Sequence, residues 1–181
     1  MIISISGTPG TGKTDVAKII AKDIGANLIT IKNVIKKEKV PYNHDKERKT
    51  KIIDKKDLEK AVGKNIDNNK TNIIEGHLSH LIKSDVVIIL RCNPEVLEKR
   101  LKKRKWNKKK INENVLAEVL DATTIEALEI NNKKRIYEID TSKINADRAA
   151  KIAMKIINKD DDKKYLSGKI DWAEKYLRKK V

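Results

Sequence analysis

The chain has 181 residues, of which 42 are Lys or Arg and 26 are Asp or Glu, so its formal net charge at pH 7 is +16. This length suits one domain over residues 1–181, and the positive charge indicates polyanionic partners such as nucleotides or RNA. The apolar run Ile2–Ser6 is too short for a signal peptide, and no apolar run approaches the ~18 residues of a membrane span, so we expect a soluble, cytoplasmic protein without a membrane partner.

Apolar runs alternate with amphipathic runs along the chain, in the order expected of repeated strand–helix units. We therefore predict an α/β fold with a mostly parallel sheet flanked by helices. The expected strands are Ile2–Ser6, 27–31, Asn72–Glu75, 85–90 and 136–139. The expected helices are 13–24, 54–66, Pro94–Lys103, 114–131, Ala146–Ile157 and 170–177.

Three segments stand outside this alternation. Residues 30–55 are polar and weakly patterned, which is more typical of a functional lobe than of core. The strongly basic segment Arg104 to Lys110 lies between two helical patterns. Residues 165–181 follow the last strand–helix unit, and we expect them to form a packed or mobile helical appendage.

The segment Gly7 to Thr14 reads Gly-Thr-Pro-Gly-Thr-Gly-Lys-Thr and fits the phosphate-loop motif in full, between an expected strand and an expected helix. Glycines allow successive backbone N–H groups to surround phosphates, and the helix N-terminus adds partial positive charge. Lys13 can reach the β- and γ-phosphates, and the Thr14 hydroxyl can bind the Mg²⁺ that bridges them. The expected ATP-binding residues of this motif are Gly10, Thr11, Gly12, Lys13, Thr14 and Asp15.

A second group of candidates follows the strand that ends at Glu75. Ligands of open α/β sheets bind at the carboxyl ends of the strands, which makes Glu75 the expected partner of Thr14 at Mg²⁺. Gly76 permits close approach, and His77 is expected to face the phosphates as a catalytic residue. An equally good interpretation of His77 is a loop histidine bonded to backbone, and the pair His77 and His80 lacks a third metal ligand.

Between Lys99 and Lys110, nine of twelve positions are Lys or Arg. Such a run can be a solvated face, an RNA-binding strip or a lid over nucleotide phosphates. Arg100 and Arg104 are four residues apart and so share one helix face, which favours a lid. Arginine suits a transferring phosphoryl group, so Arg104 is the expected catalytic residue of this lid.

Taken together, these segments resemble one family. The motifs are the phosphate loop, the turn Glu75-Gly76-His77, the run from Leu90 to Leu97, and the basic run from Arg100 to Ile111 with Asn114 and Glu118. In combination they are similar to the adenylate kinase isoenzyme six family, the small archaeal or nuclear adenylate kinase-like ATPases linked to maturation of the small ribosomal subunit. The resemblance covers the chain from Ile2 to about Ile157.

The resemblance implies a P-loop NTPase fold with a monophosphate-binding lobe at about 30–55 and a basic lid at about 100–111. It implies Mg²⁺-dependent transfer of the γ-phosphoryl group of ATP to AMP, with broad monophosphate specificity, and ATPase activity. Arg104 would contact ATP, and Lys36 and Arg91 would bind AMP. The chain departs from the family at Glu75, where aspartate is frequent, and at Lys36, where arginine is frequent.

Two functions remain open at this point. The chain could be a nucleoside monophosphate kinase, or an ATPase in small-subunit assembly and rRNA processing whose transient partners are a small-subunit ribosomal protein and the pre-ribosomal particle. A GTPase is less favoured, because Asp140-Thr141-Ser142-Lys143 stands where a guanine-reading Asn-Lys-x-Asp segment would be expected.

Overall fold

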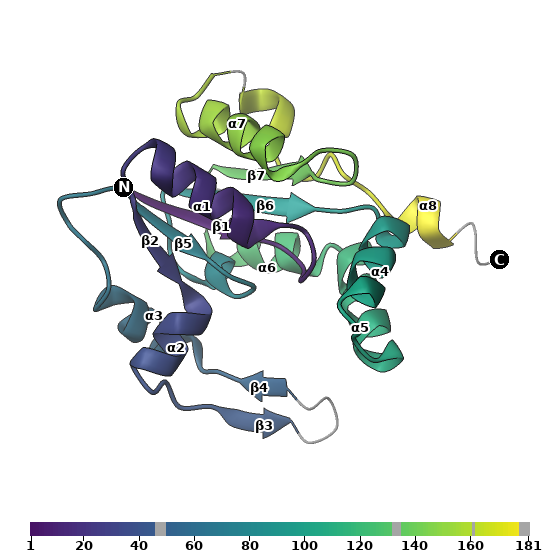
Figure 1. Cartoon of the computed structure of the whole chain (residues 1–181), viewed down its shortest axis with the longest axis horizontal. Coiled ribbons are helices and arrows are strands. Elements are labelled where there is room, and N and C mark those ends of the chain that lie inside the picture. Colours follow the sequence, from purple (N-terminus) through teal and green to yellow (C-terminus); the bar gives the residue numbers. More distant parts are fainter. Residues whose placement is uncertain (46–49, 132–134, 161, 178–181) are drawn as a thin grey trace.

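The protein is built on a five-stranded sheet in the computed structural model, which describes residues 1–45, 50–131, 135–160 and 162–177 (Figure 1). Every neighbouring pair of strands is parallel, so all five carboxyl ends meet at one edge. This confirms the predicted P-loop α/β architecture. In spatial order the strands are β2 (Asn27–Thr30), β5 (Asn72–Glu75), β1 (Ile2–Ser6), β6 (Val86–Arg91) and β7 (Ile136–Asp140).

Helices cover both faces of the sheet, which explains why β6 is apolar from Val86 to Leu90. Ile88 and Leu90 pack in the core under α1 (Lys13–Asp23) and α7 (Ala146–Ile157). Val87 and Ile89 point to the other face, where they meet α6 (Ala122–Ile130). On that second face, α3 (Lys55–Gly63) and α2 (Ile31–Lys37) cover the β2–β5 end of the sheet.

The segment expected as a monophosphate-binding lobe contains a hairpin that was not predicted. Its strands, β3 (Asn43–Asp45) and β4 (Thr50–Ile52), pair antiparallel and follow α2. Figure 1 shows the hairpin projecting from the body below α2. Within this expected lobe, residues 46–49 lie outside the described residues.

The basic segment is part of a helical pair, α4 (Pro94–Lys103) and α5 (Lys108–Val119), which we call the α4–α5 arm. The arm has a small core of its own, to which Leu97, Leu101, Ile111 and Val115 contribute. The single helix expected over 114–131 is wrong at both its start and its continuity. The Asn107 side chain accepts from Lys110 N at 2.8 Å and begins α5 earlier, and Asp121 takes a left-handed conformation (φ 53°) that ends α5 before α6.

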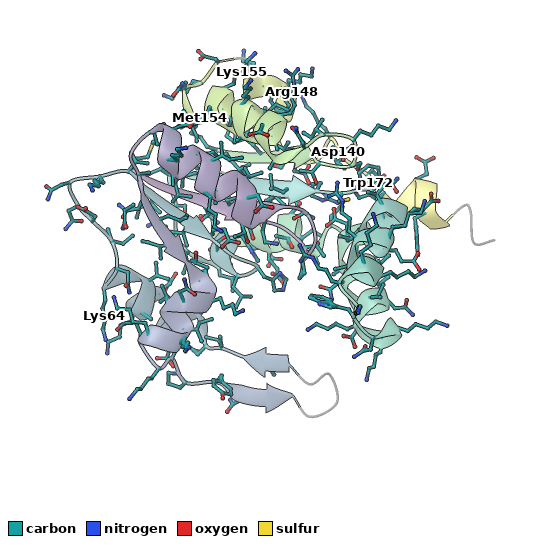
Figure 2. All side chains as sticks on the ribbon, in the orientation of Figure 1. Lys64, Asp140, Arg148, Met154, Lys155 and Trp172 are labelled. Carbon is teal, nitrogen blue, oxygen red and sulfur yellow. The ribbon has the colours of Figure 1, made fainter. Side chains whose placement is uncertain are left out.

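The C-terminal segment returns to the body of the protein. After η2 (Asp162–Tyr165), Leu166 forms a bridge with Tyr137 on the sheet edge. Figure 2 shows Trp172 directly before α8 (Ala173–Leu177), and its side chain is buried. Tyr176 packs against the core of the α4–α5 arm, so the described part of the appendage is packed, although its helix is shorter than expected. The last four positions, 178–181, lie outside the described residues.

The remaining short element, η1 (Ser79–Leu81), follows β5 and was not predicted. Among the helices of the described ranges, none combines the length and the hydrophobicity that a membrane crossing requires.

Candidate active site

The phosphate loop connects β1 to α1 at the carboxyl edge of the sheet, and its glycines are needed for its shape. Gly7 has φ 134°, and a Cβ there would lie 2.3 Å from the carbonyl oxygen of Leu90. Gly12 has φ 95° and stands at the N-cap of α1, where no side chain accepts a hydrogen bond from the helix. The first N–H groups of α1 are therefore left for an anion, which is the requirement for phosphate binding.

Lys13 is held at the bottom of this loop. Its side chain is 8 % exposed, and its Nζ donates to the carbonyl oxygen of Thr8 at 3.0 Å. Burial lowers the pKa of Lys13 to about 8. The carboxylates of Glu75 and Glu118 oppose this decrease, whereas the positive charge of Arg104 adds to it. A buried ammonium with few partners is stabilised when a polyanion binds next to it. This is what the predicted role of Lys13 in binding the β- and γ-phosphates requires.

Thr14 and Glu75 provide the oxygen ligands expected at Mg²⁺. The parallel register sets Glu75 beside Ile5 of β1, so the carboxylate lies at the carboxyl edge of the sheet. The Thr14 hydroxyl donates to Glu75 Oε1 at 2.9 Å, and both residues line the same cavity. One hydroxyl and one carboxylate suit a hard cation that keeps waters and phosphate oxygens as its other ligands. In the described ranges no cluster of three or more His, Cys, Asp and Glu side chains could hold a metal.

His77 lies in the cavity wall, after a turn at Gly76 that packs against Ile31. His77 is exposed to solvent in this wall, and partial desolvation together with the charge of Lys13 lowers its pKa, so the ring is neutral at pH 7. His80 points elsewhere. Its Nδ1 lies 2.8 Å from Ser6 Oγ and its Nε2 lies 2.7 Å from Glu126 Oε2, and His80 lines neither cavity.

A cavity of about 1280 Å³ opens in front of the phosphate loop and extends to α2. Figure 1 shows the α4–α5 arm and the β3–β4 hairpin projecting from this edge of the sheet. The cavity brings together most of the predicted site residues. They are Gly10, Gly12, Lys13, Thr14, Asp15, Lys36, Glu75, His77 and Arg104.

A second, smaller cavity of about 250 Å³ lies on the other side of the loop, between α4 and the start of α7. Its wall includes Thr11, the remaining predicted residue of the loop, and Arg104, which thus lines both cavities. Arg100 also lines the smaller cavity but is tied to the scaffold, because its Nη2 donates to the Thr141 carbonyl at 2.7 Å. Of the two arginines expected on one helix face, Arg104 is the one that lines both cavities.

The structure corrects the expectation that Arg91 binds a monophosphate. Arg91 is 2 % exposed, lies outside both cavity walls and donates hydrogen bonds to the carboxylates of Glu118, Asp121 and Glu138. These carboxylates, led by Glu118, raise the pKa of Arg91 in spite of its burial. As the last residue of β6, Arg91 points into the junction of α5 and α6 and is a structural ion-pair centre.

The side of the large cavity next to α2 contains residues that were not predicted, among them Lys32, Lys39 and Tyr42. Lys32, Lys36 and Lys39 lie on the face of α2, and just beyond its end, that borders the cavity. Their spacing of four and three residues is a helical pattern and could have identified them from the sequence. The pattern was obscured by the high lysine content of the whole chain.

The chain matches one family model and is similar to several named relatives. Residues 3–121 match the model of the family described as an AAA domain. A protein of Methanocaldococcus jannaschii named "Putative adenylate kinase" is 39% identical over 177 residues, which cover 98% of this chain and 96% of the relative. A protein of the same name from Archaeoglobus fulgidus is 38% identical, with 99% of both chains covered.

Solved structures with low sequence identity share the fold. Shikimate kinase from Acinetobacter baumannii, in complex with shikimate, aligns with a TM-score of 0.61 at 14% identity and covers 88% of this chain and 94% of that chain. The YorR protein of Bacillus subtilis, in complex with phosphorylated GDP, aligns with a TM-score of 0.56 at 17% identity, covering 87% and 96%.

Proposed function

Because the chain belongs to the AAA-domain family and to the family of the archaeal relatives that are named "Putative adenylate kinase", we infer that it transfers the γ-phosphoryl group of ATP to AMP. This reaction yields two molecules of ADP. One observation carries this proposal. The phosphate loop, which would hold the donor, and the α2 lysines, which would hold an anionic acceptor, line one continuous cavity. A kinase of nucleoside monophosphates requires this arrangement, because the two phosphates must meet in line with water excluded.

Each side of the cavity supports a different part of the reaction. Lys13 and the N–H groups of α1 would hold the β- and γ-phosphates, while Thr14 and Glu75 would hold Mg²⁺. The metal would neutralise charge on the phosphate oxygens when bound. Arg104 borders the space on both sides of the loop and would stabilise charge on the phosphoryl group as it moves.

The acceptor side favours a phosphate monoester with a bulky organic part. Lys36, with Lys32 and Lys39 nearby, would bind the phosphate of the acceptor. Tyr42 and Val40 offer apolar surface to a nucleoside in the same wall. The smaller cavity beyond the loop would then take the nucleoside of ATP, next to Thr141 and Asn145. The proposal includes broad monophosphate specificity, which the assay below measures directly.

A second candidate function is ATP hydrolysis coupled to a small-subunit ribosomal protein and rRNA. The observation that favours it is the exposure of the arm's lysines Lys103, Lys105 and Lys108, which border neither cavity and present charge to solvent. The neutral ring of His77, in the cavity wall, could position an attacking water in this reaction.

A coupled assay distinguishes these functions. We expect ADP formation from ATP and AMP in the presence of Mg²⁺, with turnover on AMP exceeding hydrolysis of ATP alone by at least about tenfold. CMP and dAMP in place of AMP would measure the breadth of specificity. The second function would be favoured if ATP hydrolysis did not respond to any monophosphate but increased when ribosomal protein was added. This stimulation should then fall steeply with salt concentration.

A further inference from the structure

Glu118 connects the α4–α5 arm to the phosphate loop through a buried carboxylate. It is 2 % exposed, and its Oε2 accepts a hydrogen bond from the Thr8 hydroxyl. Its Oε1 accepts from Arg91 Nε at 2.8 Å and from the backbone N–H of Cys92 at 3.0 Å. Glu118 is not among the residues that line either cavity, so it touches the loop without entering the ligand space.

Thr8 passes this contact on to the residue that would bind phosphate. The Thr8 carbonyl accepts from Lys13 Nζ at 3.0 Å and from the Thr11 hydroxyl at 2.9 Å. Thr8 itself is 2 % exposed. Its hydroxyl donates to the buried carboxylate of Glu118, and its carbonyl accepts from the buried ammonium of Lys13. The hydrogen bond to Glu118 therefore holds the side chain of the same residue whose carbonyl orients Lys13.

We propose that Glu118 is a positioning residue of the phosphate loop, which fixes Thr8 and through it sets the place of the Lys13 ammonium for the phosphates of ATP. The identity of the ligand rests on the proposed function. A carboxylate behind a polyanion site carries an electrostatic cost, which Arg91 offsets by direct pairing. Because Glu118 belongs to α5, its hydrogen bond with Thr8 connects the α4–α5 arm, which carries Arg104, to the phosphate loop, which carries Lys13.

The competing explanation is that Glu118 serves only as a counter-ion for Arg91. Glu138 provides the matched control, because it is equally buried and also pairs with Arg91. Its other contacts are the hydroxyl of Thr124 and the backbone N–H of Gly168, both away from the loop. Replacing either glutamate by glutamine removes one buried carboxylate from Arg91, but only one of the two changes reaches Thr8.

The test is a double-mutant cycle on the intact chain, with calorimetry of Mg·ATP binding as the readout. Glu118→Gln should weaken ATP binding about tenfold when Lys13 is present, since a buried charge-assisted contact is lost. In the Lys13→Met background, the same change should weaken binding by less than about twofold, because its route to the phosphates is gone. Glu138→Gln should have the same small effect in both backgrounds.

Equal losses from Glu118→Gln in the two backgrounds, or a loss no greater than that of Glu138→Gln, would overturn the proposal. Should Glu118→Gln fail to fold by circular dichroism, Thr8→Val takes its place in the cycle, with Thr8→Ser as the conservative comparison. Thr8→Ser should keep more of the affinity than Thr8→Val, and equal affinities would overturn the proposal. If the wild-type protein bound ATP but formed no ADP from ATP and AMP, the proposed function would be refuted. The double-mutant cycle would still test the role of Glu118, because it measures ATP binding alone.

Discussion

The two sides of the large cavity differ in how far they are organised before a ligand arrives. On the donor side, Thr8, Thr11 and Lys13 are at most 8 % exposed and hydrogen bond to one another. On the acceptor side, the α2 lysines Lys32 and Lys36 are exposed to solvent. A site that is already ordered loses little entropy on binding, whereas solvated lysines must be ordered by the ligand itself.

This difference separates the expected effects of mutation. Changes on the donor side should lower kcat by more than they weaken ATP binding, because they disturb groups already placed for the transition state. Changes on the acceptor side should mainly raise the KM for the acceptor, because they remove one of several adaptable contacts. The following predictions test this separation.

The largest effect is expected at Lys13. Lys13→Met removes the ammonium but keeps the apolar length of the side chain, so the fold should be retained and kcat should fall by at least about 10³-fold. The measurement is the coupled assay with ATP and AMP, with circular dichroism to verify folding. Lys18→Met, on the exposed side of the same helix, is the control. A folded Lys13→Met protein with near-normal turnover would show that the loop is not the donor site.

Arg104→Ala should follow, with a loss of about 10² to 10³ in kcat, since Arg104 is the cation that lines both cavities. Its neighbour Lys103 is exposed on α4 and lines neither cavity, so Lys103→Ala is a matched control. Single-turnover kinetics would separate the chemical step from product release. Equal turnover of the two variants would remove Arg104 from the site and return the arm to an ordinary basic surface.

A smaller loss, about 10-fold to 10²-fold, is expected for Glu75→Gln, because Mg²⁺ keeps its phosphate and water ligands. Excess Mg²⁺ should restore part of the activity, since the change weakens metal binding rather than abolishing it. Asp85→Asn is the control, because Asp85 accepts from the N–H of Ile2 at the opposite edge of the sheet. Loss of activity in Glu75→Gln that no concentration of Mg²⁺ relieves would point to a structural role beside Thr14.

The donor side was also the part that the sequence predicted well. The loop motif, the strand ending at Glu75 and the helix Ala146–Ile157 depend on neighbours in the chain, and the structure has all three where they were expected. The parallel sheet followed from the order of the apolar runs. In such cases the local pattern and the tertiary structure favour the same conformation.

The failures involve residues whose environment comes from distant parts of the chain. Arg91 donates hydrogen bonds to Glu118, Asp121 and Glu138, which follow it by 27, 30 and 47 positions. No local sequence pattern predicts contacts at such separations. The break between α5 and α6 occurs at one of these residues, Asp121, which has a left-handed conformation and pairs with Arg91. The β3–β4 hairpin is polar and lacks the alternation that identifies a strand.

The smallest effect should appear at Lys36, where it also gives the most direct test of the acceptor side. Lys36→Ala should raise the KM for AMP about fivefold to tenfold, which corresponds to roughly 1 kcal/mol, and leave kcat within about twofold. Lys37 is the matched control, because it belongs to the same helix but pairs with Glu38 and donates to Asn65 Oδ1 at 2.8 Å, outside the cavity wall. If Lys36→Ala instead lowered kcat while the KM for AMP stayed unchanged, Lys36 would act on the transition state, and the acceptor side would be as organised as the donor side. Equal kinetics for Lys36→Ala and Lys37→Ala would place the acceptor phosphate away from α2 altogether.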